Sequence, residues 1–137
     1  MLKSLFSNSV TIPVLRLSGV IGQAGMFRSG LTSNSLDKLI NKLFSEKKSP
    51  AVALIINSPG GSPSQSSLIA QRIITKSIEK KKKVIVFAED VAASGGYWLA
   101  CSANEIYVDK NSVVGSIGVI SPGFGFVNLI RKIGVER

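Results

Sequence analysis

Two short, wholly apolar segments constrain the fold of this chain more than any other feature. They are Ala51–Ile56 and Val84–Phe87. Both are too short for a globular helix, and continuous apolarity is typical of a parallel strand that is covered on both faces. Each run is followed by a turn containing two glycines, and apolar residues at helical spacing come next. Strands that alternate with helices imply right-handed crossovers, so the sequence predicts an α/β protein with a largely parallel sheet.

The other segments fit the same alternation. We expect one α/β domain over residues 1–137, or part of one, with residues 1–11 as an N-terminal tail. The remaining expected elements are a strand over Pro13–Ile21, a loop over Gly22–Gly30, a helix with its N-cap at Ser33 or Asn34 that ends at Lys47–Pro50, a helix over about Pro63–Lys80, a short helix to about Ala103, a strand over Glu105–Val108, an extended segment over Val113–Ile120, and an amphipathic helix over about Phe126–Ile133.

The composition excludes several kinds of site. The 137 residues include no histidine, so no Ser-His-Asp or Cys-His catalytic set and no histidine-ligated metal site can be completed within them. Cys101 is the only cysteine, which excludes an internal disulfide and a thiolate metal cluster. It ends the apolar run Tyr97–Cys101, so we expect a buried packing thiol, with a reactive thiol as the alternative. No metal and no cofactor are predicted.

The net charge of +9 arises from 17 basic and 8 acidic residues. Four of the lysines are consecutive, Lys80 to Lys83, at the expected end of a helix, where cations complement the helix dipole. Aromatic residues do not interrupt this run and no nucleic-acid-binding motif is present, so we expect a solvated helix end and no nucleic-acid partner. Attraction to anionic lipid headgroups is the alternative. No apolar stretch suffices for a spanning helix, and Met1–Ser9 lacks the core of a signal peptide.

The candidate chemistry lies at the two glycine turns, Asn57–Gly61 and Ala92–Gly96. Each follows a buried strand, and ligands of open α/β sheets bind at the carboxyl ends of the strands. Glycines let successive N–H groups point into one concavity, where an oxyanion can be stabilised. Taken singly, a glycine pair is a tight turn and Ser94 is a helix N-cap. Together they supply a hydroxyl and two N–H donors, the minimal equipment for acyl transfer.

Three blocks of sequence resemble a known family. Leu54–Ser62, Ala92–Trp98 and Val114–Val119 are similar, in order and spacing, to motifs of peptidase family S49. These are the signal peptide peptidase A and SohB-type serine proteases of the Clp protease/crotonase superfamily. The resemblance runs from about Ile12 to the last residue. It implies a ClpP/crotonase-like superhelix of strand-strand-helix units.

The resemblance also implies roles for individual residues. Ser94 would be the nucleophile of a serine endopeptidase that cleaves apolar peptides, such as signal peptides, through an acyl-enzyme. The N–H groups of Gly95 and Gly61 would form the oxyanion hole. Residues expected to bind the substrate are Gly60, Gly115, Ser116, Ile117 and Gly118, in a segment over Val114–Ile120 that lies beside the groove and pairs with extended peptide.

The family's general base is a lysine, which agrees with a chain that lacks histidine. Counted from Ser94, that lysine would fall beyond Arg137, and neither Lys110 nor Lys132 matches its position. We therefore expect residues 1–137 to form an incomplete peptidase domain with little activity by itself. Relatives assemble into rings or domes, so a homo-oligomer is expected. Many relatives carry a membrane anchor, which is not seen in this sequence, so the location expected of this bacterial-type protein stays open between the cytoplasm and a membrane surface.

Two other functions remain open from the residues. A crotonase-like acyl-CoA enzyme would share the fold and the paired N–H donors. Its chemistry uses carboxylates, and the acidic residues near the turns are Glu89 and Asp90. We expect these two carboxylates to be solvated in a loop or to make a surface hydrogen bond. A non-catalytic scaffolding subunit would keep the fold without the base.

Overall fold

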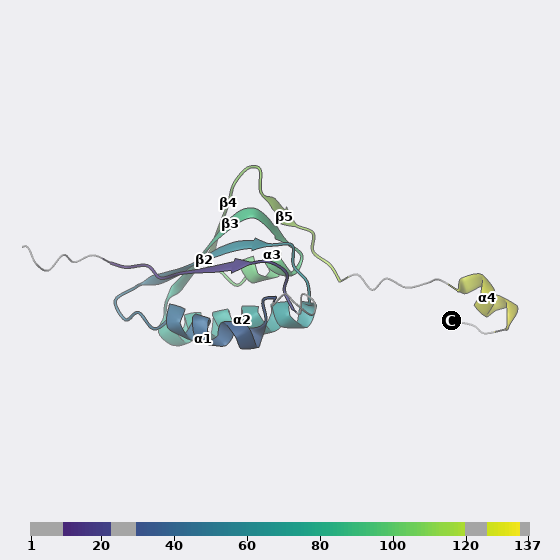
Figure 1. The fold of residues 1–137 in the computed structure, drawn as a ribbon, viewed down its shortest axis with the longest axis horizontal. Coiled ribbons are helices and arrows are strands. Elements are labelled where there is room, and N and C mark those ends of the chain that lie inside the picture. The colour runs from purple at the N-terminus through teal and green to yellow at the C-terminus, as the bar shows by residue number, and fades with distance from the viewer. Residues whose placement is uncertain (1–9, 23–29, 120–125, 135–137) are drawn as a thin grey trace, which may run out of the picture.

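The computed structural model describes residues 10–22, 30–119 and 126–134, and residues 23–29 of the expected loop and Ile120 lie outside these ranges. Its elements alternate along the chain (Figure 1). They are β1 (Val14–Ser18), α1 (Ser33–Leu43), β2 (Ala51–Ser58), α2 (Pro63–Lys80), β3 (Lys83–Ala93), α3 (Gly95–Ala100), β4 (Glu105–Val108), β5 (Val113–Gly115) and α4 (Val127–Lys132).

The five described strands form one parallel sheet in the order β1-β2-β3-β4, and β5 pairs with the far end of β3. The register aligns Leu17 with Ile56 and Ser58 with Ala92. Both glycine turns therefore leave the same edge of the sheet. The predicted α/β class with a parallel sheet is confirmed.

One face of this sheet carries the core. Figure 1 shows α1 and α2 on one side of the strands, and α2 contacts both α1 and α3. The core is made of branched aliphatic side chains from strands and helices, including Leu17, Ile40, Leu54, Ile56, Ile69, Ile73, Val84, Val86 and Leu99. On the other face, Phe87 is 45% exposed and stacks on Tyr107 with 5.4 Å between ring centroids. The prediction that Val84–Phe87 is covered on both faces is wrong, because no described helix lies over Phe87.

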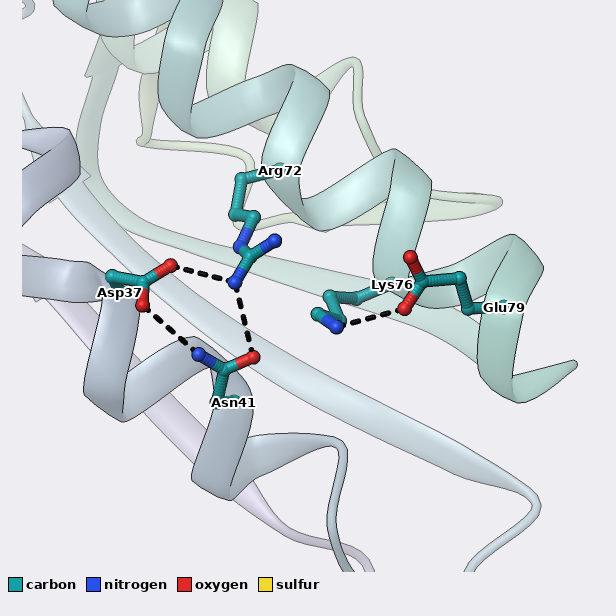
Figure 2. A network of polar contacts seen from close by, with 5 residues as sticks. All are labelled: Asp37, Asn41, Arg72, Lys76 and Glu79. Carbon is teal, nitrogen blue, oxygen red and sulfur yellow. Dashed lines mark hydrogen bonds and ion pairs between the residues drawn. The ribbon is translucent and has the colours of Figure 1, made fainter.

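A polar network joins the outer surfaces of α1 and α2 (Figure 2). One guanidinium nitrogen of Arg72 lies 2.7 Å from a carboxylate oxygen of Asp37 and donates to Asn41 Oδ1 at 3.2 Å. The Asn41 amide donates to the other Asp37 oxygen. Within α2, the Lys76 ammonium lies 2.7 Å from Glu79, and this bond lowers the pKa of that carboxyl.

Several element ends differ from the sequence prediction. The N-cap of α1 is Thr32, because Thr32 and Ser35 exchange side-chain and backbone hydrogen bonds in a capping box. The first strand ends at Ser18, where Gly19 turns the backbone with φ 102°. β3 extends to Ala93, so Glu89 and Asp90 lie in a strand and not in a loop. α3 is shorter than expected and ends at Ala100.

The lysine run is only partly solvated. Lys81 adopts a left-handed conformation at the end of α2, with φ 52°. The turn directs Lys82 inward, where it is 8% exposed and its ammonium donates to the carbonyl of Glu46. The expectation of a solvated helix end is therefore wrong for Lys82, while Lys80, Lys81 and Lys83 are exposed.

Candidate functional site

The two glycine turns meet at the carboxyl ends of β2 and β3. A Cβ atom added at Gly60 would lie 2.6 Å from the Gly95 nitrogen and 2.8 Å from the Ser94 Cβ. A Cβ atom at Gly96 would lie 2.5 Å from the Ser58 carbonyl oxygen. Such distances are too short for any side chain, so the contact between the turns requires glycine at both positions.

Ser94 stands between the end of β3 and the first turn of α3. Its backbone has φ 52° and ψ −119°, an uncommon conformation for a residue other than glycine. Its N–H donates to the Gly115 carbonyl at 2.8 Å, and its carbonyl accepts from the Trp98 N–H at 3.0 Å. The hydroxyl makes no capping hydrogen bond to α3. Ser94 is thus the N-cap residue of α3 by position, as the sequence taken singly predicted, but its side chain does not cap the helix.

The two expected oxyanion donors flank Ser94. Within the described residues, neither the Gly61 N–H nor the Gly95 N–H donates a hydrogen bond. Gly61 is fixed from behind by Ile21, whose N–H donates to the Gly60 carbonyl and whose carbonyl accepts from Ser62, both at 2.8 Å. Gly95 is the first residue of α3, where intrahelical acceptors are absent.

Ser94 opens into a pocket of about 240 Å³. The described residues that line it are Gly61, Pro63, Ser94, Gly95, Tyr97, Trp98, Cys101, Ile117, Gly118 and Val119. Among them there is no lysine, histidine or carboxylate. The lining is therefore mostly apolar, with Ser94 as its aliphatic hydroxyl and the two glycines whose N–H groups are unengaged.

Cys101 corrects the sequence prediction. Its side chain is exposed and lines the pocket, whereas a buried packing thiol was expected. Helical spacing explains the difference, because Tyr97, Trp98 and Cys101 share one side of α3 while Leu99 and Ala100 face the core. Nothing in the apolar run of the sequence distinguishes these two sides.

The other predicted substrate residues divide into two groups. Ser116, Ile117 and Gly118 line an adjoining cavity of about 410 Å³ together with Ser94. Gly60 is buried behind the pocket, and Gly115 contributes the carbonyl that holds Ser94. Neither is part of the described lining of these two cavities.

The remaining candidate residues lie on the surface. Lys110 is in the exposed turn between β4 and β5, and Lys132 is exposed on α4. The Glu89 carboxylate pairs with Arg16, and Asp90 accepts from the Asn57 amide at 2.8 Å. Both acidic residues make the surface contacts that the sequence predicted. None of the helices in the described ranges is long and apolar enough to span a membrane.

Comparisons with known proteins identify the family of the chain. The model of peptidase family S49 matches residues 76–137, a range that contains Ser94. Protease 4 of Haemophilus influenzae is 36% identical over 126 residues, which cover 91% of this chain and 20% of that protein. The chloroplastic serine protease SPPA of Arabidopsis thaliana is 35% identical over 124 residues, which cover 90% and 18%. The chain belongs to peptidase family S49.

Another relative of this S49 chain carries a different name. The Na⁺/H⁺ antiporter NhaA of Brucella abortus is 54% identical over 127 residues, which cover 92% of this chain but 17% of that protein. Because the match covers only 17% of that protein, the antiporter name describes a protein most of which has no counterpart in this chain. The chain thus spans between 17% and 20% of the length of these three relatives.

Solved structures place the S49 chain in the ClpP-like fold. A mutant of the membrane-bound stomatin-specific protease 1510-N has a TM-score of 0.61 at 20% identity, over 81% of this chain and 49% of that one. ClpP1 of Listeria monocytogenes has a TM-score of 0.50 at 23% identity, over 66% and 46%. These likenesses establish the fold, as the sequence resemblance implied.

Proposed function

We propose that this chain carries the nucleophile and the oxyanion hole of a serine endopeptidase of the signal peptide peptidase type, which acts on apolar peptides. One observation carries the proposal. The Ser94 hydroxyl makes no capping bond and opens into an apolar pocket, beside the unengaged N–H groups of Gly61 and Gly95.

The chemistry follows from this arrangement. The Ser94 oxygen attacks the carbonyl carbon of the scissile peptide, and its proton passes to a general base. The tetrahedral oxyanion lies between the two N–H donors, each of which contributes about 10²–10³ in rate in comparable sites. Collapse breaks the C–N bond, and the leaving amine takes the proton from the base. Water then attacks the acyl carbon and gives a proton to the base. The bond to the Ser94 oxygen breaks, and that oxygen takes the proton back.

The proposed base is a lysine, as in the family. Among the described residues that line the pocket there is no lysine, so we place this base outside them. Without it, the Ser94 hydroxyl loses a general-base contribution of about 10²–10⁴ in rate. We therefore expect weak turnover by any form of the protein in which no lysine reaches Ser94.

The proposed substrate is an extended apolar peptide. Tyr97, Trp98 and Ile117 give the pocket an apolar wall that fits an aliphatic or aromatic side chain. Beyond β5, Ile117 and Val119 are 81% and 73% exposed, so we propose that this segment is available to contact an extended peptide. Self-association and peripheral membrane binding belong to the same proposal, on the strength of the family resemblance.

The direct test is covalent labelling of Ser94. The chain is treated with an alkyl fluorophosphonate, and the modified residue is located by peptide mass spectrometry. We expect one phosphonyl group on Ser94, its loss in Ser94→Ala, and its retention in Ser102→Ala, a buried serine outside the pocket lining. Because the pocket lining supplies no base, labelling is slow and is followed to long incubation times, and no labelling of Ser94 even then would contradict the proposal.

Further measurements separate the alternatives. Binding of a CoA thioester without labelling would favour the crotonase-like function, and absence of both would favour a scaffold. Rapid, Ser94-dependent turnover of a fluorogenic apolar peptide that persists in Lys3→Ala, which removes the one lysine among the residues that the structure does not describe, would overturn the placement of the base outside the described residues.

A further inference from the structure

Ser58 is a buried polar side chain that the chemistry above does not use. It is the last residue of β2 and is 0% exposed. Its hydroxyl oxygen accepts a hydrogen bond from the Gly60 N–H at 3.1 Å. This bond spans two residues and closes the turn between β2 and the proposed oxyanion donor at Gly61.

The bond decides which N–H group of the turn is engaged. Gly60 is buried, and its N–H would otherwise lack an acceptor, which is costly for a buried donor. With the Gly60 N–H directed to Ser58, the neighbouring Gly61 N–H is the one that remains unengaged beside Ser94. The Gly60–Gly61 peptide, which carries this N–H, is held at its carbonyl by the Ile21 N–H at 2.8 Å, and the Ser58 bond holds the preceding Pro59–Gly60 peptide. The two bonds together fix the left-handed backbone of Gly60, with φ 93°.

Ser58 also contacts the second turn. Its carbonyl oxygen would lie 2.5 Å from a Cβ atom at Gly96, and its own Cβ would lie 3.2 Å from that atom. One residue therefore touches both turns, through its hydroxyl on one side and its backbone on the other. A displacement of Ser58 would change the position of Gly61 relative to Ser94.

We propose that Ser58 is a positioning residue for the oxyanion hole. It holds the Pro59–Gly60 peptide and thereby the φ of Gly60, which sets the direction of the Gly61 N–H toward the substrate oxygen, and it contacts no substrate itself. This inference rests on the proposed function of Ser94 and Gly61.

The experiment compares a charged tetrahedral adduct with a neutral ligand. A peptidyl boronic acid with an apolar terminal residue adds to the Ser94 oxygen; the O–B bond forms, the hydroxyl proton goes to solvent, and the boronate becomes an anion. The matched peptidyl amide has the same side chains and no such charge. Trp98 is the only tryptophan and lines the pocket, so its fluorescence reports the binding of both ligands.

The variants isolate the hydroxyl of Ser58. Ser58→Ala removes it, and Ser58→Thr keeps an acceptor at the same position. Ser49→Ala is the matched control, since Ser49 is also buried and lies just before the other end of β2, where its hydroxyl bonds to the Ala51 carbonyl. Thermal melting of each variant shows that it is folded.

We expect Ser58→Ala to weaken boronate binding by about 10-fold to 100-fold and to leave the amide affinity within about 2-fold, because only the anion needs the Gly61 N–H. Ser58→Thr restores most of the boronate affinity, and Ser49→Ala changes neither. In ¹⁵N-labelled protein, the Gly60 amide exchanges with solvent faster in Ser58→Ala than in Ser49→Ala.

Two outcomes overturn the inference, and they are distinguishable. If Ser58→Ala keeps the ratio of boronate to amide affinity found in the unmodified chain, Ser58 does not position the donor, while Ser94 keeps its role. If the unmodified chain binds boronate no better than amide, and Ser94→Ala changes nothing, the proposed function fails and the role of Ser58 fails with it.

Discussion

At the scale of single residues, the site depends on how closely two backbone turns approach each other. Gly60 and Gly115 both have positive φ, 93° and 103°, but their surroundings differ. A Cβ atom at Gly60 would meet the Gly95 nitrogen at 2.6 Å and the Ala93 oxygen at 2.7 Å, whereas one at Gly115 would meet nothing within 4 Å. The pair therefore separates backbone strain from steric crowding.

We expect Gly115→Ala to cost about 1–2 kcal/mol in the free energy of unfolding, the strain of the left-handed region alone. Gly60→Ala should cost about 1–3 kcal/mol more, because the crowded atoms belong to the backbone and cannot move away. Urea unfolding of the two variants measures both values. Equal losses would show that the turns separate readily, which is incompatible with a rigid oxyanion hole.

The sequence predicted that the turns around Ser94 and Gly61 lie together at one edge of the sheet, because a glycine turn after each of two consecutive buried strands is a specific combination. It did not predict the exposure of Cys101 or the buried hydroxyl of Ser58. Both depend on which side of a short element faces the core. In α3 and at the end of β2, apolar and small residues occur on both sides, so periodicity carries no signal there.

At the scale of elements, the strands and helices were predictable because each long apolar run is bounded by glycine, proline or lysine. Their ends were not. β3 runs to Ala93, past the polar pair Glu89 and Asp90, because pairing with β5 supplies hydrogen bonds there. Aspartate and glutamate disfavour strand structure, but this tertiary contact outweighs their preference.

β4, at the edge of the sheet, gives a prediction about pH. The Tyr107 hydroxyl donates to the Glu105 carboxylate at 3.0 Å, which raises the pKa of Tyr107, while the bonds from Tyr107 and Lys83 lower the pKa of Glu105. The stabilisation by Glu105 is thus lost as pH falls through its lowered pKa. The stabilisation by Tyr107 is present below the pKa of this residue in the unfolded chain, and it is lost as pH rises through the raised pKa in the folded chain.

Glu105→Gln should bring the pKa of Tyr107 back toward its ordinary value near 10. The phenolate absorbance is titrated in a Tyr97→Phe background, in which Tyr107 is the one remaining tyrosine of the two in the chain. Glu79→Gln, an exposed paired carboxylate on α2, is the control and should leave the titration unchanged. An unaltered midpoint in Glu105→Gln would show that the hydrogen bond does not persist in solution.

At the scale of the whole molecule, the same sheet and helices that form the core also position the site. Helices cover one face of the sheet, and the turns that hold Ser94 leave its carboxyl edge beside α3. The sequence predicted this architecture from the alternation of elements. It could not predict that Phe87 and Tyr107 stack on the face without a described helix, because both lie in strands whose apolar runs look the same on either side.

The last helix tests how far the core extends. Figure 1 shows α4 well away from the sheet, and its residues Leu129 and Ile133, the second at its C-cap, are 55% and 67% exposed. Because these apolar side chains remain in contact with water, they contribute little burial to the folded state.

Removal of residues 127–137 should therefore shift Tm by less than about 2 °C, measured by circular dichroism. Leu99→Ala, at a fully buried position, is the positive control and should cost about 2–5 kcal/mol. A loss on truncation as large as that of Leu99→Ala would mean that α4 packs against the sheet in solution.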